Sequence, residues 1–84
     1  MVVLTEAEVK IILKVYDICY ISLNDEIYTG LLTEICSSHY LYQSIISLEI
    51  KGILKSYIDK RKKYVYFTIA GQRVAKALNI IRMN

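Results

Sequence analysis

The sequence predicts one small α+β domain, with three helices and a short strand ahead of a two-stranded β-hairpin and a last helix. Three observations predict this class. Apolar residues recur at helical spacing up to residue 51, β-branched and aromatic residues gather between residues 53 and 68, and helical spacing returns from residue 69. The 84 residues, 55% of them hydrophobic, suffice for one packed core and exclude a disordered tail.

The first helix is predicted from about Glu6 to Tyr20. Thr5 and Glu8 have the spacing of a capping box, in which each side chain bonds the backbone N–H of the other residue. An apolar stripe at helical spacing follows, made of Val9, Ile12, Leu13, Tyr16 and Tyr20. Residues 21–23 tolerate a β conformation, so we expect a connector or a brief strand there.

Two further helices are predicted before residue 52. Asn24 is a strong N-cap for a helix from about Asp25 to Cys36, and acidic residues occupy its first turn. The next helix is predicted from His39 or Tyr40 to Lys51, and Gly52 ends it. Its apolar stripe is Leu41, Ile45 and Leu48, with Ile46 and Ile50 flanking the stripe. The turn between these two helices has about three residues, which is helix-turn-helix spacing.

The pattern then changes from helical to β. Residues 53–58 and 64–68 are predicted strands, and the wholly polar segment 59–63 between them makes a hairpin with a basic tip. Thr68 is an N-cap for a last helix from Ile69 to about Arg82.

This order of elements is that of a winged helix-turn-helix, in which the hairpin is the wing. Residues 48–54 (LEIKGIL) resemble the LExxGLI segment where a recognition helix meets the wing in MarR-like and PadR-like regulators. Residues 67–74 (FTIAGQRV) resemble the LTxxGxxx segment that follows the wing. The compact size is similar to that of small winged-helix proteins encoded by archaeal viruses and plasmids. The resemblance covers residues 4–78 and implies binding to double-stranded DNA. The extra terminal helices that form the dimer interface and ligand pocket of MarR-type proteins are not expected here.

The charges are unevenly distributed along the chain. Residues 1–39 carry two basic and six acidic side chains, whereas residues 40–84 carry nine basic and two acidic ones. A strongly basic half in a small domain indicates a polyanion partner, and a merely solvated surface is the alternative.

The third predicted helix supplies the expected contacts to DNA bases. Helical geometry puts Tyr40, Gln43, Ser44 and Ser47 on one exposed strip, and in helix-turn-helix proteins the N-terminal part of this helix enters the major groove. The side-chain amide of Gln43 can accept a hydrogen bond from N6 of adenine and donate one to N7. An ordinary polar helix face is the alternative. The candidate DNA contacts of this helix are Ser38, His39, Tyr40, Tyr42, Gln43, Ser44 and Ser47.

The wing supplies the expected contacts to the DNA backbone. Its tip has four consecutive cations with no apolar member, and Arg61 is the best candidate for insertion into a minor groove. A solvated turn that protects the hairpin edge is the alternative. The candidate phosphate contacts of this region are Lys51, Lys55, Lys60, Arg61, Lys62 and Lys63.

Eight of the nine aromatic residues are tyrosines. Tyr64 and Tyr66 share one face of the second wing strand, whereas Val65 and Phe67 share the other. Tyrosines beside cations can stack on unpaired bases of RNA or single-stranded DNA, but cross-strand packing within the hairpin is the favoured interpretation.

Enzymatic and metal functions find no support in the sequence. Cys19 and Cys36 stand seventeen residues apart with a single histidine, His39, so we expect no metal, no cofactor and no enzymatic activity. The cysteines are expected to be small core residues, with a disulfide as the minor alternative. No segment has the length and apolarity of a membrane span or a secretion signal, so we expect a cytoplasmic protein.

Both chain ends carry a surplus of apolar residues. Val2, Val3 and Leu4 precede the first helix, and Ile80, Ile81 and Met83 crowd the end of the last one. Because a small monomer would leave some of them exposed, we expect a homodimer through the first and last helices, with fraying ends as the alternative. The sequence as a whole therefore predicts a sequence-specific, dimeric, double-stranded DNA-binding transcription regulator. The alternatives are a winged-helix protein-interaction module and an RNA or single-strand binder.

Overall fold

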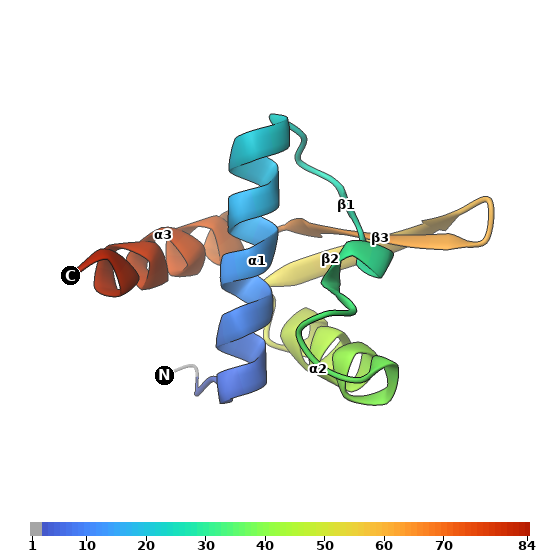
Figure 1. The fold of residues 1–84 in the computed structure, drawn as a ribbon, viewed down its shortest axis with the longest axis horizontal. Helices are drawn as coiled ribbons and strands as arrows, with labels where there is room; N and C mark the ends of the chain where they lie inside the picture. The colour runs from blue at the N-terminus through green and yellow to red at the C-terminus, as the bar shows by residue number, and fades with distance from the viewer. Residues whose placement is uncertain (1–2) are drawn as a thin grey trace.

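The computed structural model describes residues 3–84, and the predicted apolar residue Val2 lies outside the described residues. Residues 3–84 form three α-helices and a three-stranded antiparallel sheet (Figure 1). The elements in chain order are α1 (Glu6–Ser22), β1 (Ile27–Tyr28), the 3₁₀ turn η1 (Thr29–Leu32), α2 (Ser38–Ile50), β2 (Leu54–Asp59), β3 (Lys62–Phe67) and α3 (Ile69–Met83).

Helix α1 begins as predicted and ends later than predicted. The Thr5 hydroxyl accepts the backbone N–H of Glu8 at 3.1 Å, and the Glu8 carboxylate accepts the backbone N–H of Thr5 at 2.9 Å, which confirms the capping box. Of the two alternatives for residues 21–23, the brief strand is wrong, and the connector begins only at Leu23. The helix continues to Ser22, whose hydroxyl donates to the Ile18 carbonyl, and Leu23 ends it in the left-handed region with φ 56°.

The helix predicted from Asp25 to Cys36 is also wrong. This segment contains strand β1 and the 3₁₀ turn η1 instead. Ile27 pairs with Val65 and Tyr28 with Tyr64, so β1 forms an edge strand of the sheet next to β3. Pairing with a partner strand outweighs the weak helical preference of a stretch that contains Gly30.

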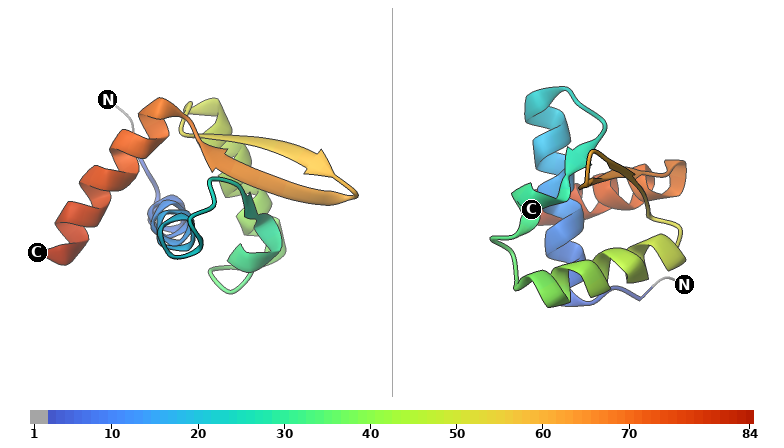
Figure 2. Two further views of the ribbon diagram at one scale, coloured as in Figure 1. Left: turned by 90° about the horizontal axis from the view of Figure 1, so that it is seen from above. Right: turned by 90° about the vertical axis from the view of Figure 1, so that its right-hand side faces the viewer.

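The sheet has the strand order β1-β3-β2, so β3 is its central strand. Strands β2 and β3 pair over their full lengths, from Leu54 opposite Phe67 to Asp59 opposite Lys62. The predicted five-residue polar loop is therefore shorter, and only Lys60 and Arg61 form the turn. Both have positive φ angles, 50° and 65°, as in the two-residue turns that match the twist of a hairpin. The long hairpin projects from the body of the domain (Figure 2).

One hydrophobic core joins all the elements. Within residues 3–84 it contains twelve buried apolar side chains, among them Ile12 of α1, Leu41 and Ile45 of α2, Val65 of β3 and Ala75 of α3. Leu4 packs against this core, so the predicted exposed N-terminal cluster is reduced to Val3 among the described residues.

Helix α3 starts in close contact with the segment before β2. The Thr68 hydroxyl caps it by accepting the Gly71 backbone N–H at 2.9 Å, and Thr68 N–H donates to the Ile53 carbonyl at 3.1 Å. In Figure 1 the helix crosses behind α1 and carries the C-terminus away from the hairpin. Across residues 3–84, no helix combines the length and apolarity needed to cross a membrane.

Candidate nucleic-acid interface

Helix α2 buries one face and exposes the other. Leu41, Ile45 and Leu48 face the core as predicted. The N-terminal half of α2 is open to solvent on this face, with Ser38, His39 and Gln43 exposed and Tyr40 63% exposed. Ser37 occupies the N-cap position without a side-chain cap bond, so the first N–H groups of α2 are not capped by that hydroxyl.

The centre of the exposed face differs from the predicted strip. Ser44 and Ser47 are only half-buried positions at its border, whereas Ile46 and Ile50 are 49% and 81% exposed. Helical geometry explains the difference, because these isoleucines lie opposite the stripe that contains Leu48. The sequence pattern predicts both isoleucines to lie beside the core stripe. The sequence does carry a signal for this exposed apolar surface, because Ile46 and Ile50 form an i, i+4 pair outside the core stripe.

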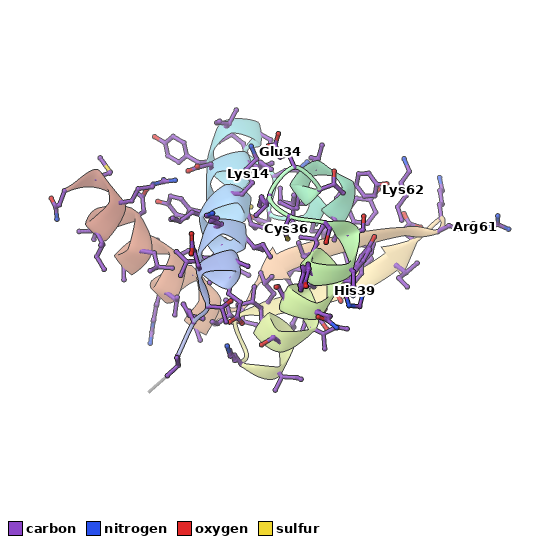
Figure 3. All side chains as sticks on the ribbon, turned by 60° about the horizontal axis from the view of Figure 1, so that its bottom comes forward. Lys14, Glu34, Cys36, His39, Arg61 and Lys62 are labelled. Carbon is purple, nitrogen blue, oxygen red and sulfur yellow. The ribbon has the colours of Figure 1, made fainter. Side chains whose placement is uncertain are left out.

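The hairpin tip presents its cations to solvent. Lys60, Arg61 and Lys62 are exposed, and Lys55 is exposed on β2. None of these four forms an ion pair within the part of the chain that the structure describes. Figure 3 shows Arg61 at the free end of the hairpin, directed away from the body of the domain. At the tip, Lys60, Arg61 and Lys62 outnumber the one carboxylate, Asp59, which lies opposite Lys62 in the strand register, so the tip is net positive.

Glu49 connects α2 to the hairpin. Its carboxylate accepts a hydrogen bond from the Ser56 hydroxyl on β2 and lies 3.7 Å from Lys63 Nζ on β3. The Lys63 ammonium is also 6.0 Å from the centre of the Tyr42 ring on α2. These contacts bring the two sets of predicted DNA contacts together, and they half-bury Lys63, which is therefore less available to a phosphate than predicted.

Lys51 is also occupied inside the protein. Its ammonium donates to both oxygens of Glu8 at 2.8 Å and to the Val3 carbonyl at 2.8 Å. Burial of Glu8 acts to raise the pKa of its carboxyl, but hydrogen bonds from Lys51, Thr5 and Ser47 outweigh burial, so the pKa is lowered. Lys51 therefore holds α2 to α1, which is a different role from the predicted phosphate contact.

The tyrosines form a cross-strand ladder on the sheet face opposite Val65. Tyr57 and Tyr64 stack with ring centres 5.3 Å apart and planes 14° apart, and Tyr28 lies 5.9 Å from Tyr64 on the other side. Tyr66 extends the ladder, 6.4 Å from Tyr57. This arrangement confirms the predicted cross-strand packing. Lys62 lies over the Tyr28 ring at 5.3 Å.

The two cysteines are free, and both are half-buried against the core, as predicted for small apolar residues. Burial raises the pKa of the Cys19 thiol, which keeps it protonated. His39 is exposed at the start of α2 and contacts the Tyr40 ring edge-on, with ring centres 5.6 Å apart. His39 therefore remains a candidate DNA contact, and the N-cap position of α2 is occupied by Ser37.

No family model matches the chain, and no curated protein matches it. Among solved structures, the fold is similar to that in the crystal structure of AF1382 from Archaeoglobus fulgidus. The superposition has a TM-score of 0.79 and covers 94% of this chain and 87% of that chain, with 21% sequence identity. This similarity supports the fold, a small α+β domain with three helices and a three-stranded antiparallel sheet, and carries no function with it.

Proposed function

We propose that this chain is a winged-helix protein that binds double-stranded DNA and regulates transcription. In this proposal α2 is the recognition helix and enters the major groove, while the β2–β3 hairpin is the wing and contacts the adjacent backbone or minor groove. The observation that carries the proposal is the coupling of the two elements through Glu49. A solvent-exposed helix face and a cluster of cations without acidic partners are held in one rigid unit.

The contacts divide by chemistry into base readers and phosphate anchors. Gln43 offers the donor and acceptor pair that adenine matches, and exposed Ile46 offers an apolar contact for a thymine methyl group. Lys55, Lys60, Arg61 and Lys62 are the anchors, because their cationic groups are exposed and have no acidic partner among residues 3–84.

Fluorescence anisotropy with random duplex DNA, single-stranded DNA and RNA across a salt series tests the proposal. We expect a preference for duplex. The K60A/R61A variant should bind more weakly, and its slope of log affinity against log salt should fall by about 1.8, which is about 0.9 for each lost phosphate contact. A K10A/R73A variant is the matched control, since it removes the same charge from exposed positions of α1 and α3.

The Gln43→Ala variant separates base reading from anchoring. We expect it to reduce the preference for the selected operator, with little change on random duplex. An equal loss on all sequences would remove Gln43 from the readout. Failure to bind any nucleic acid at low salt would overturn the DNA proposal and favour the protein-interaction module.

The tyrosine ladder favours a second candidate, binding of single-stranded DNA or RNA. Tyr28 and Tyr57 are each 38% exposed, and Lys55 and Lys62 share the register of this face. Tighter binding of single strands than of duplex, lost in a Tyr28→Ala variant, would move the assignment to this surface.

We further propose that the protein acts as a homodimer through α1 and α3. Ile80, Ile81 and Met83 at the end of α3 are exposed, and so is Ile21 at the end of α1. A dimer would bury these side chains and place two recognition helices on half-sites about one DNA turn apart. Sedimentation equilibrium should detect the dimer, and Ile81→Glu should convert it to a monomer without unfolding it.

A further inference from the structure

A groove of about 820 Å³ lies on the side of the domain where α1 ends, and it is not used by the proposed DNA contacts. Its lining comes from the second half of α1, the loop before β1, the end of β3 and the first half of α3. Its volume falls in the range of sites that hold small organic molecules, roughly 300–1,000 Å³.

Aromatic side chains give the groove its walls. Tyr16 and Tyr66 are half-buried lining residues, and Tyr20 is an exposed one. These tyrosines come from α1 and β3, which are far apart in sequence. Tyrosine rings provide apolar contact area together with an electron-rich face that attracts cations.

Two carboxylates give the groove its charge. Asp25 and Glu26 lie side by side in the loop before β1, and both line the groove. Lys76 is the single cation of the lining, and it is an exposed residue of α3. The lining is therefore net negative, in a protein whose formal net charge is +3.

The combination of rings and carboxylates selects the chemistry of the ligand. A small anion would be repelled by Asp25 and Glu26. A neutral apolar molecule would leave the negative charge of both carboxylates uncompensated. An organic cation with an apolar body can make cation–π contacts with the tyrosine rings. Its positive charge is also attracted by the two carboxylates.

The groove is also joined to the hairpin. The Tyr57 hydroxyl on β2 donates to the Glu26 carboxylate, and Tyr57 lies 6.4 Å from the lining residue Tyr66. A cation that pairs with Glu26 would therefore lie beside a hydrogen bond that holds the loop before β1 to the hairpin.

We propose that this groove is a binding site for small organic cations, formed by Tyr16, Tyr20 and Tyr66 with Asp25 and Glu26. The inference does not depend on duplex binding, because none of these five residues is among the proposed duplex contacts. Tyr66 also belongs to the tyrosine ladder of the single-strand candidate.

Choline and its neutral isostere 3,3-dimethyl-1-butanol provide the test. The two molecules have nearly the same shape, and only choline is charged. In a ¹H–¹⁵N NMR titration of the full chain, we expect choline to shift the amides of the groove and to bind about tenfold more tightly than the isostere, which corresponds to about 1.4 kcal/mol. Equal affinities, shifts confined to other regions, or no binding of choline would overturn the proposal.

Two variants assign the binding to the named groups. D25N/E26Q should abolish the preference for choline, whereas E6Q/D59N, which removes the same charge from exposed positions outside the lining, should keep it. Tyr20→Ala should weaken choline binding, and Tyr40→Ala on α2 is its control. The dispersion of the same NMR spectra reports whether each variant is folded. Unchanged choline affinity in folded D25N/E26Q would also contradict the site.

Discussion

Glu8 in the first turn of α1 and Lys51 directly after α2 form an ion pair in which Lys51 Nζ is 2.8 Å from both carboxylate oxygens. Glu8 is only 1% exposed and also completes the capping box with Thr5. One buried carboxylate therefore caps α1 and fixes the end of α2. Because α2 carries the exposed face proposed to meet DNA, this pair determines how that face is oriented.

Replacement of Lys51 by methionine should destabilise the domain. The variant keeps the length and apolar stem of the side chain but leaves the Glu8 carboxylate buried without its cation. Breaking a fully buried pair typically costs about 3–5 kcal/mol. The Lys51 side chain is 26% exposed, so we expect about 2 kcal/mol. Urea unfolding at neutral pH measures the change, and Lys10→Met on the exposed face of α1 is the control.

The Glu8–Lys51 pair should also give stability a defined pH dependence. The pKa of Glu8 is lowered from 4.5 in the folded state, so its contribution is complete above pH 4.5 and is lost as pH falls through the lower folded value. The difference in unfolding free energy between wild type and Lys51→Met should therefore shrink below pH 4.5. A difference that stays constant down to acid unfolding would contradict this linkage.

Some elements of this fold are encoded by residues close together in sequence, and others depend on distant partners. The capping box at Thr5 and the core stripe of α2 depend on neighbouring residues, and both were predictable from their spacing. The β1–η1 segment was mispredicted because its conformation depends on pairing with Val65 and Tyr64, nearly 40 residues away. Local apolar spacing there resembles a helix, and a single sequence does not reveal the partner strand.

In the candidate site too, some features follow from the local sequence and others from tertiary packing. Exposure of Gln43 and of the hairpin cations follows from periodicity and polarity, and it was predictable. The internal partners of Lys51 and Lys63 depend on where α1 and α2 pack, so their roles in the fold became visible only in three dimensions. The groove was hidden for the same reason, since its tyrosines are contributed by separate elements.

Gly71 should not tolerate a side chain. A Cβ atom at this position would lie 1.9 Å from the backbone carbonyl oxygen of Ile53, and a backbone atom cannot move aside cheaply. We expect Gly71→Ala to cost about 3 kcal/mol in the free energy of unfolding. Gly30→Ala is an informative control. A Cβ there would meet the ring of Tyr28, which can rotate away. Thermal unfolding should therefore show a much larger loss for Gly71→Ala than for Gly30→Ala.

The hairpin turn should be less stable with its two cationic residues than with residues that favour a left-handed backbone. Lys60 and Arg61 both occupy the left-handed region, which costs roughly 1–2 kcal/mol for each ordinary residue. A K60N/R61G variant supplies the residues that a two-residue turn prefers, so we expect it to gain about 1–2 kcal/mol of stability. Its DNA affinity should fall because two anchoring cations are lost.

The K60A/R61A variant distinguishes the backbone effect from the charge effect. It removes the same charges but leaves alanines in the left-handed region, so we expect weaker DNA binding without the gain in stability. Unfolding and anisotropy measurements on both variants separate the backbone effect from the charge effect. An equal gain in stability for the two variants would mean that charge repulsion at the tip, and not backbone strain, limits the stability of the wild-type turn.

The Asp17–Arg82 pair should hold the last turn of α3 against α1. The two Arg82 amino groups donate to the two Asp17 oxygens at 2.9 and 2.8 Å, and this hydrogen bonding lowers the pKa of the Asp17 carboxyl. Arg82→Gln should therefore accelerate hydrogen exchange in the last turn of α3 without affecting the core strands. Arg73→Gln is the control, since Arg73 is exposed and forms no ion pair within residues 3–84. Because the pair is partly exposed, the difference should diminish at high salt, and a difference independent of salt would indicate packing by the arginine stem instead.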